Sequence, residues 1–255
     1  MTHAFADKTV IVTGAAHGFG RAIALAFSRH RAVVWACDVL ADELRETEQL
    51  CRTAGGRCTT RTVDVRDKVA VDAFVAEVTK DAGRVDILVN NAGGVLGQVG
   101  RSLEVVTPDE WRSIFDVNCT AAFYFAQAVA PGMKAARAGR IINISSGAGL
   151  GISLTGIQAY ASAKAAQIGL TRQLAHELGP WDITVNNVAP GFVRSNPATE
   201  RQWESYGPEG QRELIERIAL KRLGTPEDIA NGVMFFASEQ ANWISGQVLS
   251  IDGGK

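Results

Sequence analysis

Short apolar runs alternate with segments of helical periodicity along most of this chain, and this alternation restricts the possible folds strongly. The runs with the composition of strands are Val10–Val12, Val33–Cys37, Thr60–Val65, Val85–Val89, Arg140–Ile144, Ile183–Val188 and Gln247–Ile251. Helices are expected at Gly18–Arg29, Ala41–Ala54, Val69–Ala82, Ala159–Gly179 and Pro226–Ser238, and a long helix pair is expected at Pro108–Lys134. Strands that are apolar on both faces must be covered on both sides. With right-handed crossovers, the pattern predicts an α/β fold: a doubly wound, mostly parallel sheet with helices on both faces.

The chain length and the absence of breaks favour a single domain. A chain of 255 residues is long enough for one large α/β domain, and no linker, repeat or low-complexity tract divides it. We therefore expect residues 1–255 to form one domain. The irregular stretch is 192–222, which contains Pro197, Gly207–Pro208 and Gly210. We expect it to be an excursion from the domain that forms a substrate loop or lid over a site.

Charge and composition exclude several classes of partner. The formal net charge is −1, which gives no reason to expect a nucleic acid or a membrane surface as partner. No apolar run has the length of a membrane span, and the N-terminus lacks a signal-peptide pattern. We therefore expect a cytoplasmic protein. The four cysteines and four histidines show no ligand-like spacing, so we expect reduced thiols and no metal site.

A glycine-rich turn connects the first strand to the first helix. Thr13 to Gly20 reads T-G-A-A-H-G-F-G. Glycine allows a tight turn and a close approach to a pyrophosphate, and the helix N-terminus attracts its negative charge. The second strand ends in Asp38. An acid there would accept hydrogen bonds from the adenosine ribose and repel a 2′-phosphate, which favours NAD over NADP. Asp38 would also serve as an N-cap for the next helix, and that alternative stays open.

Small polar residues follow three further strands, at the edge where ligands bind in open α/β sheets. They are Asp64–Val65, Asn90–Gly93 (N-N-A-G) and Ser145–Ser146. Tyr160 and Lys164 are then four residues apart in Y-A-S-A-K, on one face of an expected helix. The pentapeptide by itself indicates no more than two helix neighbours.

Taken together, these motifs resemble those of the short-chain dehydrogenase/reductase family, in its single-domain form of about this length. The glycine turn resembles the family's T-G-x-x-x-G-x-G, and Asn118 in F-D-V-N-C matches its helix asparagine. Ser146 stands fourteen positions before Tyr160, and Ser195 replaces the threonine of the family's P-G-x-x-x-T. The resemblance covers nearly the whole chain and implies a Rossmann fold that binds NAD. It implies coenzyme contacts from Gly14, His17, Gly18, Phe19, Gly20, Asp38, Asp64, Val65, Asn91, Ala92, Gly93, Tyr160, Lys164, Pro190, Gly191, Val193 and Ser195.

The resemblance also implies four catalytic residues. Tyr160 would be the general acid or base, and a neighbouring Lys164 ammonium is expected to lower its pKa. Ser146 would orient the substrate oxygen, with Ser145 as its neighbouring alternative. Lys164 would also hold the nicotinamide ribose. Asn118 would hold a water that links Lys164 to solvent.

The substrate pocket is expected between Ser146, Val95, Ile152, Phe192 and Trp203. Trp203 would equally well anchor the excursion. Apolar walls with a few polar groups suit a sugar, a polyol, a hydroxy acid or an alicyclic alcohol. The predicted function is NAD-dependent interconversion of such an alcohol and its carbonyl. The rivals are an NADP-dependent carbonyl or 3-oxoacyl reductase and a non-catalytic dinucleotide sensor. The resemblance further implies a homodimer or homotetramer.

Overall fold

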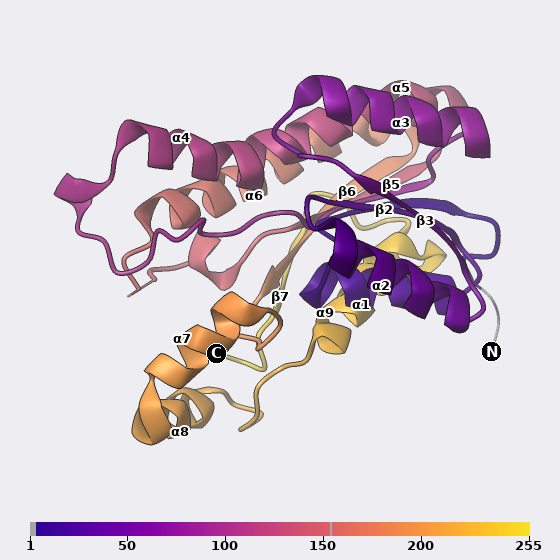
Figure 1. The fold of residues 1–255 in the computed structure, drawn as a ribbon. Coiled ribbons are helices and arrows are strands. Elements are labelled where there is room, and N and C mark those ends of the chain that lie inside the picture. The colour runs from indigo at the N-terminus through magenta and orange to yellow at the C-terminus, as the bar shows by residue number, and fades with distance from the viewer. Residues whose placement is uncertain (1–3, 154) are drawn as a thin grey trace.

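A single parallel sheet forms the centre of the molecule (Figure 1). The computed structural model describes residues 4–153 and 155–255, so residues 1–3 and 154 of the predicted domain lie outside the described part. The strand order is β3-β2-β1-β4-β5-β6-β7, and all paired strands run parallel. The predicted doubly wound α/β sheet is therefore confirmed. The strands are β1 Thr9–Thr13, β2 Val33–Asp38, β3 Arg57–Thr62, β4 Ile87–Asn90, β5 Gly139–Ile144, β6 Ile183–Pro190 and β7 Val248–Ile251.

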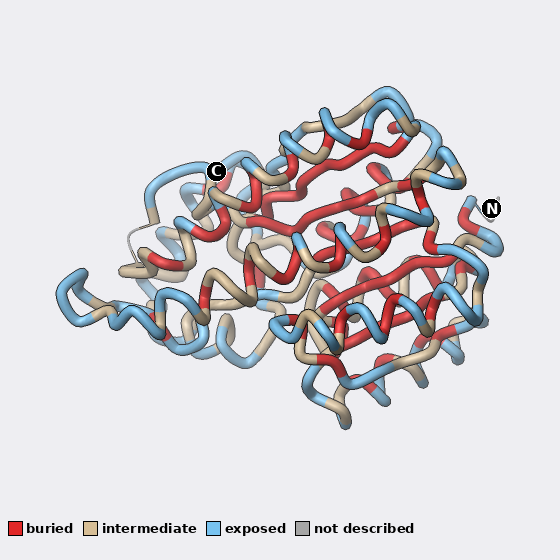
Figure 2. Tube along the Cα trace, turned by 90° about the horizontal axis from the view of Figure 1, so that it is seen from above, coloured by how far each residue is buried: buried red, intermediate tan, exposed pale blue. Residues whose placement is uncertain are grey.

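Helices cover both faces of this sheet. On one face, α1, α2 and α9 pack on a core that includes Val10 and Val12; on the other, α3, α5 and α6 pack on a core that includes Ile11. Figure 2, which looks down on the sheet, shows that the central strands are buried along most of their length. Successive strand residues thus enter opposite cores, which explains the continuous apolar runs. The helices are α1 Gly18–Arg29, α2 Ala41–Thr53, α3 Lys68–Ala82, α4 Pro108–Phe115, α5 Ala121–Ala136, α6 Gln158–Leu178, α7 Pro197–Ser205, α8 Gly207–Arg217 and α9 Pro226–Ala237.

The third strand begins and ends three residues earlier than the sequence pattern predicted. Gly55 and Gly56 end α2 abruptly, and Arg57 then pairs at once with Val33 of β2. β3 is an edge strand whose residues are mostly polar and partly exposed. Its position is set by pairing with β2, whereas the prediction followed the apolar residues Val63 and Val65, which lie after the strand. Asp64 consequently lies beyond the strand rather than at its last position.

The long helical segment after β4 is interrupted by one wide turn. α4 and α5 are joined by a π-helical turn, Asp116–Thr120, which contains the buried Asn118. Such turns insert one extra residue into a helix and re-aim a side chain.

The order of the strands reverses direction between β1 and β4. Strands β2 and β3 extend the sheet to one side of β1, and β4 to β7 extend it to the other. In open α/β sheets, ligands bind outside the carboxyl ends of the strands at this switch point. A ligand site is therefore expected among the loops that follow β1, β2, β4, β5 and β6.

The predicted excursion at 192–222 contains α7 and α8, which stand beside the helical layers in Figure 1. Asn196 caps α7: its side-chain oxygen accepts hydrogen bonds from the amides of Ala198 and Thr199, and Pro197 starts the helix. Among the described residues, no helix has the length and apolarity to span a membrane. Within the same residues, no group of three or more potential metal ligands comes together.

Candidate active site

A cleft of about 860 Å³ opens at the carboxyl ends of the strands. Many of the residues singled out in the sequence line it: Gly14, His17, Gly18, Phe19, Asp38, Asp64, Val65, Asn91, Ala92, Gly93, Val95, Ser146, Tyr160, Lys164, Pro190, Gly191, Phe192, Val193 and Ser195. Four of the expected residues do not line it: Gly20, Asn118, Ile152 and Trp203. The fold thus brings together segments that are more than a hundred residues apart in sequence.

The glycine turn is packed too closely for larger side chains. A Cβ on Gly14, whose φ is +65°, would come within 2.7 Å of the Ala92 Cα, and one on Gly20 would meet the Gly14 carbonyl at 2.1 Å. Asn91 holds the turn in place, because its side-chain amide donates to the carbonyls of Thr13 and Gly14 at 3.0 and 2.9 Å. Gly20 therefore acts through packing rather than by lining the cleft.

The N-terminus of α1 faces this turn and is suited to an anion. No side chain caps it, and its first turn contains no acidic residue. No carboxylate of α1 itself therefore competes for its first amides or for the positive end of the helix dipole. Together with the close approach permitted by the glycines, this arrangement fits the pyrophosphate of a dinucleotide.

The Asp38 carboxylate accepts hydrogen bonds from backbone amides of both the glycine turn and the segment after β2. One carboxylate oxygen accepts from the Ala16 amide at 3.0 Å, and the other accepts from Val39 and Leu40 at 2.7 and 3.1 Å. The N-cap position of α2 is Leu40, so Asp38 is not the helix cap considered as the alternative. Its side chain instead ties the glycine turn to the end of β2 and places a negative charge there.

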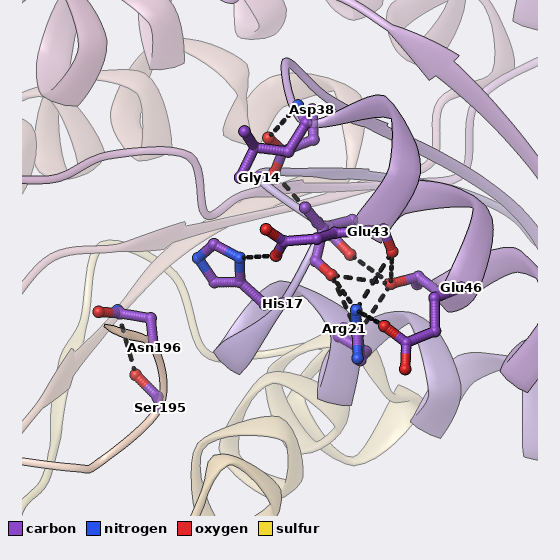
Figure 3. Close-up of polar contacts among 12 residues, drawn as sticks. Gly14, His17, Arg21, Asp38, Glu43, Glu46, Ser195 and Asn196 are labelled. Atoms are coloured by element: carbon purple, nitrogen blue, oxygen red, sulfur yellow. Dashed lines mark hydrogen bonds and ion pairs between the residues drawn. The ribbon is translucent and has the colours of Figure 1, made fainter. Parts of the chain in front are cut away.

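His17 contacts a residue that the sequence did not single out. Its Nδ1 lies 2.5 Å from Oε2 of Glu43, which reaches across from α2 (Figure 3). Beside it, the Arg21 guanidinium donates to the Ala16 carbonyl at 2.5 Å and to Glu46 at 2.9 Å. Glu43 belongs to a polar, charged helix with many equivalent acids, so no sequence signal distinguished it.

Asp64 and Val65 border the same end of the cleft from the loop after β3. Asp64 forms an ion pair with Arg66 at 2.6 Å, and hydrogen bonds from Arg66 hold the pKa of Asp64 below its usual range. Val65 is buried and contributes an apolar wall.

Tyr160 and Lys164 lie on α6, next to the turn that carries Ser146. Gly149 allows this approach: a Cβ there would come within 2.8 Å of the Lys164 backbone. The Ser146 hydroxyl accepts from the Ala148 amide at 3.2 Å. Ser145 points elsewhere, because its buried hydroxyl donates to the Asn187 side chain. Of the two serines, Ser146 is therefore the one available to the cleft.

Burial controls both ionisable groups on α6. It raises the pKa of Tyr160, and a hydrogen bond with Ser146 lowers it by a smaller amount. Burial also lowers the pKa of Lys164 to about 7. The expected lowering of the Tyr160 pKa by a lysine ammonium is therefore wrong for this structure. Lys164 Nζ donates to the Ile144 carbonyl at 2.7 Å and lies 5.7 Å from the Tyr160 ring centroid, and desolvation is the larger effect.

Asn118 fixes the backbone of the loop after β4. Its side-chain amide donates to the carbonyls of Gly94 and Ile114, both at 2.8 Å, and its oxygen accepts from the Gly94 amide at 3.0 Å. A Cβ on Gly93 would approach Asn118 Oδ1 to 2.5 Å and Lys164 Nζ to 3.1 Å. The side chain expected to hold a water is thus occupied mainly by protein groups, which makes Asn118 a positioning residue.

The outer end of the cleft has apolar walls, to which Val95 and Phe192 contribute as expected from the sequence. Trp203 does not line the cleft; it stacks on Phe192 with ring centroids 6.2 Å apart, so it anchors the excursion. Ile152 was wrongly assigned to the pocket: it is 93% exposed and points to solvent. Leu96, also expected from the sequence, lines the cleft, whereas the sequence missed Val99, Ser205 and Arg201, whose positions depend on how the loops fold back.

Comparison with known proteins matches this site to one family. A family model described as enoyl-(acyl carrier protein) reductase matches residues 14–255. The hydroxy(phenyl)methylsuccinyl-CoA dehydrogenase subunit BbsD of Thauera aromatica is 37% identical, over 98% of this chain and 96% of its own. The 3-oxoacyl-(acyl-carrier-protein) reductase FabG of Thermotoga maritima is 36% identical, over 97% of each chain.

Solved structures give the same result. The structure of 7α-hydroxysteroid dehydrogenase complexed with NADH and 7-oxo glycochenodeoxycholic acid superimposes with a TM-score of 0.91 and 32% identity. The match covers 99% of this chain and 96% of that one. Fold, site geometry and relatives agree, and the chain belongs to the short-chain dehydrogenase/reductase family of oxidoreductases.

Proposed function

We propose that this protein is an NAD-dependent oxidoreductase that interconverts a secondary alcohol and its ketone. The observation that carries the proposal is the meeting of Ser146, Tyr160 and Lys164 in one cleft with the glycine turn and Asp38. The cleft has a volume of about 860 Å³, which suits a dinucleotide at one end and a substrate at the other.

NAD, when bound, supplies the hydride chemistry. Ser146 donates a hydrogen bond that orients the substrate oxygen, and Tyr160 takes the alcohol proton during oxidation or returns it during reduction. Lys164 lies one helical turn from Tyr160 and holds the nicotinamide ribose. Asn118 and Gly93 keep the loop opposite Lys164 in place.

The preference for NAD follows from the charges at the adenosine end. Asp38 presents a carboxylate where the ribose would lie, and it is followed by Val39 and Leu40 rather than by a base. The nearby cations are occupied: Arg66 pairs with Asp64, and Arg21 pairs with Glu46. A 2′-phosphate beside Asp38 would therefore meet negative charge, and both of these cations are already held by carboxylates.

The substrate proposal is a secondary alcohol of moderate size. Val95, Leu96 and Phe192 offer apolar contacts, while Asn196 and Gln202 offer hydrogen bonds. This combination suits a sugar, a polyol, a hydroxy acid or an alicyclic alcohol. The relatives also favour a second candidate, NADP-dependent reduction of a 3-oxoacyl thioester, because one of them is named as a 3-oxoacyl reductase.

The test is a matrix of coenzymes and substrates followed by the absorbance of reduced nicotinamide. NAD and NADP are each combined with polyols, hydroxy acids, alicyclic alcohols and 3-hydroxyacyl thioesters. Turnover with NAD and a non-thioester alcohol is the expected result. Turnover only with NADP and a thioester would establish the second candidate. Tight NADH binding without turnover on any substrate would favour a dinucleotide sensor.

We further infer a homo-oligomer built on α4, α5 and α6. Trp111 on α4 and Phe123 on α5 remain 39% and 41% exposed, so both helices present aromatic surface that a second copy of the chain would cover. Light scattering after size exclusion should give the mass of a dimer or tetramer. A mass equal to that of one chain would contradict this inference.

A further inference from the structure

We propose that Glu43 is a second determinant of coenzyme choice, which excludes NADP by holding His17. The inference rests on the proposed binding of a nicotinamide dinucleotide in the cleft. It goes beyond Asp38 because it assigns the discrimination to an ion pair between the glycine turn and α2.

His17 is placed where it would meet a phosphate on the adenosine ribose. It follows Ala16 directly, and the Ala16 amide donates to Asp38 at 3.0 Å. His17, Asp38 and Val39 all line the same cleft. A group bound at the Asp38 carboxylate therefore shares this cleft with the imidazole of His17. An imidazole is a natural ligand for a phosphate, because it donates hydrogen bonds and gains a positive charge on protonation.

Glu43 occupies the His17 imidazole and so makes it unavailable to a phosphate. Its Oε2 lies 2.5 Å from Nδ1 of His17, and Figure 3 shows its side chain extending from α2 to the ring. The pair is partly open to solvent, with 35% and 44% of the two side chains exposed. A carboxylate at this distance engages one ring nitrogen and cancels the charge of a protonated ring. It also adds a negative charge close to the position of a 2′-phosphate, which itself carries about −1.5 to −2.

Asp38 alone does not account for the electrostatics of this region. Its two oxygens together accept three backbone hydrogen bonds, which offset part of its negative charge. Arg21 is also committed, to the carbonyls of Ala16 and Glu43 and to Glu46. Glu43 is therefore the carboxylate that determines whether a basic group on the glycine turn remains available.

The chain supplies a matched control for this idea. Glu46 is one helical turn after Glu43 on α2, but its carboxylate binds Arg21 rather than His17. Glu43→Gln and Glu46→Gln remove the same charge from the same helix. The two substitutions differ in what they release: Glu43→Gln frees His17, whereas in Glu46→Gln the Arg21 guanidinium stays bound to the carbonyls of Ala16 and Glu43.

The experiment measures dissociation constants for NADPH and NADH by nicotinamide fluorescence. We expect Glu43→Gln to tighten NADPH binding by roughly fivefold to tenfold and to change NADH binding by less than about twofold. Glu46→Gln should change both constants by less than about twofold. In the double variant Glu43→Gln/His17→Asn, the gain in NADPH affinity should disappear. Circular dichroism confirms that each variant is folded.

Two results would overturn the inference. Equal effects of Glu43→Gln and Glu46→Gln on NADPH binding would show that Glu43 acts only through its negative charge at the surface and not through His17. A gain that persists without His17 would show that the imidazole is not the ligand released. The proposed function is tested separately by the wild-type constants: tighter binding of NADPH than of NADH there would contradict the NAD preference, whatever the variants do.

Discussion

The two ends of the cleft differ in how far their ionisable residues are buried. At the catalytic end, Lys164 is only 3% exposed, and burial brings its pKa down to about 7. At the adenosine end, His17 and Glu43 are about one-third and two-fifths exposed, and a direct hydrogen-bonding contact joins the two side chains. Burial therefore shifts the pKa of a group at the catalytic end, whereas at the solvent-exposed end direct contacts between side chains hold the ionisable groups in place.

This difference predicts how strongly each end responds to substitution. In a low-dielectric environment, a lost hydrogen bond or charge is costly, because water does not replace it. Near solvent, water and salt screen the same change. We therefore expect large, salt-insensitive effects at α6 and small, salt-sensitive effects at the glycine turn.

The largest expected effect comes from Tyr160→Phe. Without the hydroxyl, no protein group transfers the substrate proton, so kcat should fall by about a thousandfold or more. NADH binding should stay within about twofold of wild type, since the ring remains. Steady-state rates and fluorescence titration measure the two quantities. Residual activity above about a tenth of wild type would remove Tyr160 from the acid–base role.

Lys164→Met should lower kcat by roughly a hundredfold and also stabilise the folded chain. The pKa of Lys164 is about 7 in the fold, against 10.5 in the open chain. Between these values the unfolded state binds the additional proton, so the cost of burying the lysine is greatest below pH 7 and fades as pH rises toward 10.5.

The gain in the free energy of unfolding for Lys164→Met should thus be on the order of 2 kcal/mol at acid pH and smaller in alkali. Urea unfolding at about pH 6 and about pH 9 tests the sign. A variant that is less stable than wild type at the lower pH would mean that Lys164 is not desolvated as the structure indicates.

Asp38→Asn tests the negative charge at the solvent-exposed adenosine end of the cleft. The amide keeps one acceptor oxygen but removes the negative charge, so the ratio of kcat/KM for NADP to that for NAD should rise by about tenfold. The effect should shrink in high salt. Loss of an acceptor for the Ala16 or Val39 amide should cost about 1 kcal/mol of stability. An unchanged coenzyme ratio would transfer the discrimination entirely to Glu43 or to shape.

The smallest effect belongs to the excursion. Trp203→Ala removes the aromatic support of Phe192 and should raise the KM of the substrate by about threefold, with kcat nearly unchanged. Ile152→Ser is the matched control, because Ile152 is exposed and outside the cleft, and it should leave both parameters unchanged. Equal responses of the two variants would indicate that Trp203 does not support the pocket.

The sequence alone determined the fold and most of the cleft. Apolar runs at β1, β2 and β4 to β6, separated by helical segments, were sufficient to predict the parallel sheet, because burial on both faces leaves a local composition signal. The glycine turn, Asp38 and Ser146 were found because their chemistry follows the ends of strands, and parallel topology brings strand ends together. Tyr160 lies within α6 and was found instead from its spacing to Lys164 and Ser146 and from the family resemblance. The edge strand β3 was displaced in the prediction because its pairing leaves no apolar pattern.

Only the tertiary structure decided how these residues behave. The direction of the Tyr160 and Lys164 pKa shifts depends on how much of the chain surrounds them, which no four-residue spacing encodes. The contact of Glu43 with His17, the bonds of Asn118 to Gly94, and the different fates of Trp203 and Ile152 join or separate segments that are distant along the chain. Periodicity is a local property of the sequence, whereas desolvation and pairing are set by neighbours that the completed fold supplies.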